Sequence, residues 1–173
     1  MTTLLLDAIV AGLALAVISG SSRQDSVTPR SAAAQADLCA LLTEAEAEAI
    51  VGKPLAAPER QRGGDCWYPE KAGSGGGGEI MLHVFPYRFD SREKFHAFLV
   101  KEVKALDDAT REAMEGTGAT VKETAVEPVP EIEAPAYYAD PTLFVLKGGK
   151  VLAIAAARPQ AVAAAAKALP RFR

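Results

Sequence analysis

The first helical pattern of apolar and polar residues begins after residue 43. Thr43 and Glu46 have the spacing of a capping box, in which two side chains satisfy free amides at the start of a helix. Gly52 can adopt the left-handed conformation that ends a helix, and Pro54 prevents the helix from continuing. The pattern therefore predicts a helix over residues 44–51. The residues expected to face a core are Leu41, Leu42, Ala45, Ala49 and Ile50.

A second, longer helix is predicted to begin near Ser91. Asp90 and Glu93 have capping-box spacing, and Ser91 is an alternative N-cap. Large apolar residues then recur at steps of three and four, which is the period of one helix face. The helix is expected to reach Met114 and to end before Gly116. The apolar stripe expected in the core consists of Phe95, Phe98, Leu99, Val103 and Leu106.

Two strand patterns precede this second helix. Residues 66–68 and 79–85 are rich in aromatic and β-branched side chains, which favours an antiparallel hairpin. Since side chains alternate across a sheet, Ile80, Leu82 and Val84 share one side of the second strand. We expect this aliphatic side to pack against the apolar stripe of the second helix, because it has no polar atom to satisfy.

The remaining strands are predicted after the second helix. Residues 119–126 alternate between apolar and polar positions, which is typical of a half-exposed strand. Residues 142–147 and 150–156 flank Gly148 and Gly149, and two glycines permit the positive φ angles of a tight turn. The chain is therefore expected to form a further strand and a second hairpin.

A final alanine-rich helix completes the pattern over about residues 160–169, with Pro159 suited to its first turn. Helices before, within and after hairpin-linked strands, without regular alternation, predict an α+β fold with an antiparallel sheet packed against helices. Hydrophobic residues make up 49% of the chain, but many are alanines that bury little area. One core is expected, and a disulfide would support it.

The charge of the chain argues against nucleic acid as a partner. The 19 basic and 22 acidic residues give a formal net charge of −3, so no basic field would concentrate a polyanion.

The N-terminus has the pattern of an export signal. Residues 4–18 form an apolar run of about 15 residues, shorter than the roughly 20 of a membrane span but typical of a signal-peptide core. Residues 1–3 carry no basic side chain and Asp7 is acidic, so an uncleaved anchor or a core helix are alternatives. We predict a signal peptide or anchor over residues 1–20, a disordered linker over 21–36 and a single α+β domain over 37–173.

The apolar run ends in a motif that is similar to a lipobox. Ile18, Ser19 and Gly20 precede Ser21, which occupies the position of the lipid-carrying cysteine. Lipid attachment requires a thiolate, and the serine hydroxyl is unreactive in that role. The expected product is a soluble periplasmic or secreted form, with the membrane contacted only through an uncleaved N-terminus.

Cys39 and Cys66 are the only two cysteines of the chain. In an exported protein an even pair indicates a disulfide, and two thiols alone do not make a zinc site. We therefore predict one bridge between them.

Signatures of catalysis are lacking from the sequence. His83 and His96 are the only histidines, and neither lies in a short-spacing cluster of metal ligands. The glycine run at residues 73–78 lacks the Gly-Lys-Ser/Thr ending of a phosphate-binding loop. We predict no catalytic residue, metal or cofactor.

The segment from Cys39 to Thr43, followed by Glu46, Gly52 and the Cys66-Trp67 pair, resembles the opening of a group of small exported bacterial proteins. The group is best represented by actinobacterial lipoproteins of unknown function. Residues 143–152 are similar to its final hairpin. The resemblance implies a signal peptide, often a lipidated cysteine, a tether and a disulfide-stapled α+β domain without a shared activity. Ser21 and residues 131–133 depart from the group's pattern.

These observations predict a noncatalytic domain of the cell envelope that binds a partner protein or a small apolar ligand. Its candidate binding face consists of Met81, His83, Phe85 and Tyr87, on the side of the strand opposite the aliphatic one. Burial of this side by the final helix or by residues 128–138 is an alternative. An enzyme with a site near His83 and a purely structural spacer are the competing functions.

Overall fold

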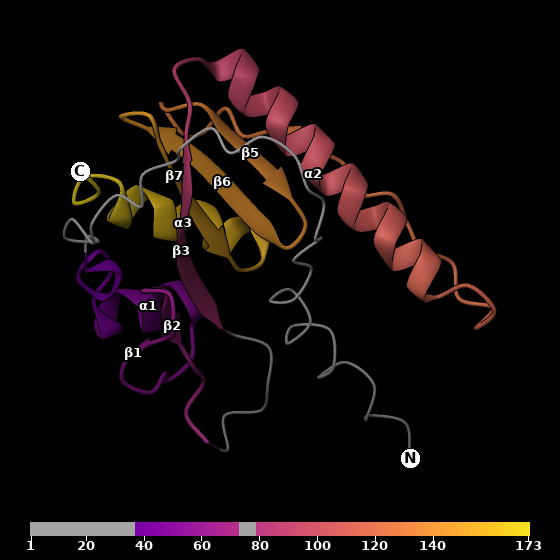
Figure 1. Ribbon diagram of the computed structural model, residues 1–173. Helices are drawn as coiled ribbons and strands as arrows, with labels where there is room; N and C mark the ends of the chain where they lie inside the picture. Colours follow the sequence, from indigo (N-terminus) through magenta and orange to yellow (C-terminus); the bar gives the residue numbers. More distant parts are fainter. Residues whose placement is uncertain (1–36, 73–78) are drawn as a thin grey trace. The chain divides into compact units, whose positions relative to one another are not determined.

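A computed structural model describes residues 37–72 and 79–173, which lie within the unit Ala34–Arg173 (Figure 1). The predictions for the signal peptide, Ser21, the linker and the glycine run fall outside the described residues. The helices of the described part are η2 (Leu38–Ala40), α1 (Glu44–Val51), α2 (Arg92–Ala113) and α3 (Arg158–Ala168). Its strands are β1 (Glu59–Arg60), β2 (Cys66–Tyr68), β3 (Ile80–Arg88), β4 (Glu127–Pro128), β5 (Ala136–Ala139), β6 (Thr142–Lys147) and β7 (Lys150–Ala155).

The strands form one antiparallel sheet in the order β1-β2-β3-β7-β6-β5-β4. The predicted α+β class and both predicted hairpins, β2–β3 and β6–β7, are confirmed. The turn of the second hairpin has φ angles of 59° at Gly148 and 76° at Gly149, as the glycine pair predicts. The start of α1 is also confirmed, since Thr43 and Glu46 form the reciprocal bonds of a capping box.

The larger hydrophobic core lies between the sheet and the helices α1 and α3. Alanines of α3 are fully buried there, because their small side chains let the helix approach the sheet closely. In α1 the buried residue is Ala47, whereas Ala45 and Ala49 are exposed, contrary to prediction. Helix α1 has only eight residues, and Ala47 is the one that it buries. The preceding leucines Leu41 and Leu42 are buried as well and supply the rest of the contact with the core.

Helix α2 packs on the opposite face of the sheet, in a smaller aromatic core. Phe95 and Leu99 lie there against Tyr137, Leu146 and Val151. The expectation that α2 covers the aliphatic side of β3 is wrong. That side faces the larger core, because α3 covers the same face of the sheet and its small alanines accept the bulky aliphatic side chains.

The second half of α2 extends beyond the sheet, so the predicted core stripe is buried only at its start. Leu106 is 51% exposed. The strand predicted over residues 119–126 does not form. Instead Asp107 of α2 accepts hydrogen bonds from the Thr124 amide at 2.7 Å and from the Thr124 hydroxyl at 2.8 Å. A side chain of α2 thus takes the place of a neighbouring strand as partner for this backbone.

Candidate functional site

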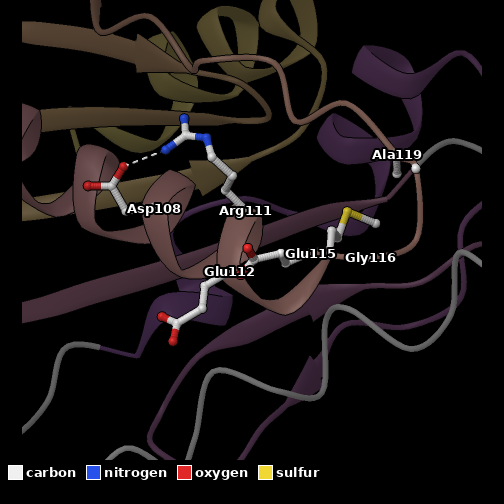
Figure 2. Close-up of a pocket in the computed structure, with 8 residues that line it drawn as sticks. Asp108, Arg111, Glu112, Glu115, Gly116 and Ala119 are labelled. Atoms are coloured by element: carbon white, nitrogen blue, oxygen red, sulfur yellow. Dashed lines mark hydrogen bonds and ion pairs between the residues drawn. The ribbon is translucent and has the colours of Figure 1, made fainter.

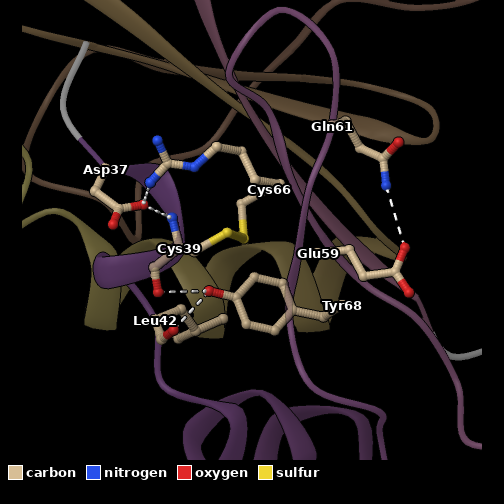
Figure 3. Close-up of a disulfide and its surroundings, with 8 residues drawn as sticks. Asp37, Cys39, Leu42, Glu59, Gln61, Cys66 and Tyr68 are labelled. Atoms are coloured by element: carbon tan, nitrogen blue, oxygen red, sulfur yellow. Dashed lines mark hydrogen bonds and ion pairs between the residues drawn. A yellow bond between two sulfur atoms is a disulfide. The ribbon is translucent and has the colours of Figure 1, made fainter. Parts of the chain in front are cut away.

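The predicted disulfide joins Cys39 and Cys66, with their Cα atoms 5.2 Å apart (Figure 3). It connects η2 to β2 at one end of the sheet. The hydroxyl of Tyr68 reinforces this connection by donating a hydrogen bond to the Leu42 carbonyl at 2.5 Å. Burial raises the pKa of Tyr68 to about 12, so its hydroxyl stays a donor at physiological pH. The disulfide therefore braces the edge of the sheet that carries β1, β2 and β3.

A second brace joins α1 to the C-terminal end of the chain. Two nitrogens of the Arg171 guanidinium donate to the two carboxylate oxygens of Glu46, at 2.7 and 2.8 Å. The Thr43 amide donates to the same carboxylate at 2.9 Å. The hydrogen bonds from Arg171 and Thr43 lower the pKa of Glu46 from 4.5 to about 2.

The lowered pKa of Glu46 predicts that the stability of the fold depends on pH. Because the folded-state pKa of Glu46 lies below its unfolded value, its contribution is present above about pH 4.5 and is lost as pH falls toward about 2. In Glu46→Gln the fall of the urea midpoint between these pH values is expected to be smaller than in the wild type. Glu44→Gln, on an exposed position of the same helix turn, is the control. An equally steep fall in Glu46→Gln would contradict the prediction.

The candidate binding residues Met81, His83 and Phe85 occupy alternate positions of β3, on the face of the sheet that carries α2. Register places Met81 opposite Trp67 of β2 and Ala155 of β7, so these three side chains share that face. Met81, His83, Phe85 and Trp67 are half-buried. Trp67 was not among the residues predicted for the site, but cross-strand pairing makes it part of the same surface.

Aromatic contacts extend this surface toward the centre of the sheet. The rings of His83 and Phe85 meet edge to face, with centroids 4.9 Å apart, and Phe85 lies 5.7 Å from Phe144 of β6. Tyr87 lies apart from Met81, His83 and Phe85. A register shift between Phe85 and Arg88 separates it from the regular ladder, and its ring contacts Phe98 of α2 instead, at 5.1 Å. The structure thus brings three of the four predicted residues together.

His83 has an acidic partner that the sequence pattern did not indicate. Its Nδ1 lies 2.5 Å from Oδ1 of Asp65, in the turn before β2. The side chains are 39% and 23% exposed, respectively. A carboxylate at Nδ1 holds an imidazole ring in a fixed orientation. In residues 37–72 and 79–173 no three His, Cys, Asp or Glu side chains gather closely enough to hold a metal ion.

Two hollows occur in other parts of the surface. One, of about 610 Å³, lies at the end of α2, where Asp108 and Arg111 form an ion pair at 2.7 Å (Figure 2). The other, of about 330 Å³, lies between Arg92 and the proline-rich segment that joins β4 to β5. Charged side chains line half of the first hollow, whereas prolines and aliphatic residues line most of the second. Neither hollow is lined by Met81, His83 or Phe85, so the candidate face is a sheet surface and not the wall of either hollow.

No family model matches the chain, and no curated protein or solved structure matches it either. Among the helices of the described residues, none has the length and apolar character needed to cross a membrane.

Proposed function

We propose that the protein is a noncatalytic exported domain of the cell envelope that binds a partner protein or an apolar ligand. Binding takes place on the α2 side of β2 and β3, through Met81, His83 and Phe85 together with Trp67. The observation that carries this proposal is that Met81 and Trp67 belong to neither hydrophobic core of the described residues. Large apolar side chains that share a surface without serving a core are typical of an interaction site.

The cellular location is part of the same proposal. The Cys39–Cys66 disulfide is consistent with an extracytoplasmic compartment, where such bonds persist. The resemblance to actinobacterial lipoproteins supports a bacterial envelope protein that reaches this compartment with a signal peptide. Ser21 in the lipid-attachment position supports a form without lipid.

An enzyme is the second candidate, and one observation favours it. The Asp65 carboxylate contacts His83 at Nδ1 and orients the ring, as the carboxylate does in a Ser-His-Asp triad. The carboxylate and the imidazole lie on the same face as the binding residues. A substrate bound there would therefore contact the same surface.

Site-specific photo-crosslinking in the producing cells tests the binding proposal. A benzophenone amino acid in place of Met81 is expected to give a discrete mass increase in the recovered protein after irradiation. The control position is Ala163, an exposed residue of α3 on the other side of the sheet. No adduct at position 81, or the same adducts at both positions, would contradict the proposal.

A further inference from the structure

The exposed surface over β1, β2 and β3 combines aromatic side chains with carboxylates. Register places Glu59 of β1 opposite Trp67, on the same face as Met81. The indole nitrogen of Trp67 donates a hydrogen bond to Glu79 at 3.2 Å. We call this surface the acidic aromatic face, and its residues are Glu59, Asp65, Trp67, Glu79, Met81 and His83.

The carboxylates of this face are not neutralised by lysine or arginine within the described residues. Glu59 and Glu79 bond to Gln61 and Trp67, which are uncharged, and Asp65 bonds to His83. Arg60, which follows Glu59 in the sequence, alternates to the other face and pairs there with Asp37 at 2.8 Å. The face therefore presents negative charge around an apolar platform.

Helix α2 leaves this part of the sheet open. Its core includes Tyr137, Leu146 and Val151 in β5, β6 and β7, and in β3 the residue that packs against this core is Phe85. In Figure 1, α2 runs along the side of the sheet that carries β5 and β6, and β1 and β2 lie apart from it. The acidic aromatic face thus remains accessible at the edge that the disulfide braces.

We propose that the acidic aromatic face binds a basic segment of a partner protein. This inference rests on the proposed binding function and names the chemistry of the partner. A lysine or arginine stem packs over Met81 while its charge lies over the Trp67 ring and near the carboxylates. Indole is the strongest cation–π partner among side chains, and the Glu79 carboxylate beside it strengthens the attraction. An extended peptide fits an open sheet surface better than a small molecule, which requires a concave site.

Trp67 itself reports binding, because it is the single tryptophan of the chain. Three synthetic peptides that alternate leucine with arginine, citrulline or glutamate are titrated against the protein, and tryptophan emission is measured. The arginine peptide is expected to change the emission saturably, and the uncharged citrulline peptide to bind several-fold more weakly. The glutamate peptide is expected not to bind. Raising the salt concentration weakens binding of the arginine peptide, since the carboxylates are partly exposed.

Variants locate the binding site. Glu79→Gln is expected to weaken binding of the arginine peptide about two- to fivefold, the range for one exposed ion pair. Glu102→Gln, at an exposed position of α2 outside the face, is the matched control and leaves the affinity unchanged.

The outcomes separate this inference from the proposed function. Equal affinity for the arginine and citrulline peptides overturns the preference for basic partners, while the face stands as a binding surface. No change of emission with any peptide overturns the inference, and crosslinking at position 81 then decides the proposed function separately. An emission change that depends on protein concentration without peptide assigns the face to a second copy of the chain, which also overturns the inference.

Discussion

Reduction of the Cys39–Cys66 disulfide is expected to lower the free energy of unfolding by about 3–4 kcal/mol. The two residues are 27 positions apart, so the bond closes a long loop and restricts the unfolded chain. A loss of this size is a large fraction of the stability of a small domain. The hydrogen bond from Tyr68 to the Leu42 carbonyl does not depend on the disulfide, so η2 is expected to stay in place in the folded reduced protein.

Urea unfolding of the oxidised and reduced protein measures this effect. The double variant Cys39→Ala/Cys66→Ala, measured with and without reductant, is the control and should not respond to reductant. Equal unfolding free energies for the oxidised and reduced wild type would contradict the prediction. Two reactive thiols in protein recovered from the oxidising compartment would contradict the bridge itself.

The elements that the sequence predicts correctly are those specified by local signals. The helix start at Thr43 and Glu46 depends on residues three positions apart, and the turn at Gly148 and Gly149 depends on two adjacent glycines. Cys39 and Cys66 could be paired because the chain offers no other thiol. In each case the physical cause lies in residues that the sequence itself identifies.

The sequence pattern places α2 on the wrong side of the sheet, because the side on which a helix packs depends on long-range contacts. Alternation shows that Leu82 and Met81 face opposite ways, but not which helix lies on either side. That choice depends on the pairing of β3 with β7, which brings α3 to the aliphatic face. Likewise, alternation in residues 119–126 predicts a strand, whereas the Asp107 carboxylate holds this segment beside α2.

The sequence predicts only part of the candidate site, because the other residues join it through pairing between strands. Met81, His83 and Phe85 share a face by alternation within one strand, and that much is visible in the sequence. Asp65 and Trp67 join them only through the register between β2 and β3. Asp65 and Trp67 flank Cys66, and the predicted hairpin brings this segment beside the strand of Met81. That position is the sequence signal that could have placed both residues in the site.

Binding on β3 requires that one face of the strand serves the larger core and that Met81, on the other face, is free to contact a partner. Leu82 is fully buried between Cys66 and Ile154, whereas its neighbour Met81 is half-buried and packs in neither core. Leu82→Ala is therefore expected to lower the free energy of unfolding by about 2–5 kcal/mol, because it removes contacts and leaves a cavity. Met81→Ala is expected to cost about 1 kcal/mol or less, since little core packing is lost.

Urea unfolding of these two adjacent variants compares the two faces of β3 directly, because each substitution truncates an unbranched or γ-branched apolar side chain to alanine on one face. We expect a large loss of stability for Leu82→Ala and a small one for Met81→Ala, with the folded structure retained in the latter. A loss for Met81→Ala as large as that for Leu82→Ala would show that this side chain serves the core, and would contradict a free binding face on β3.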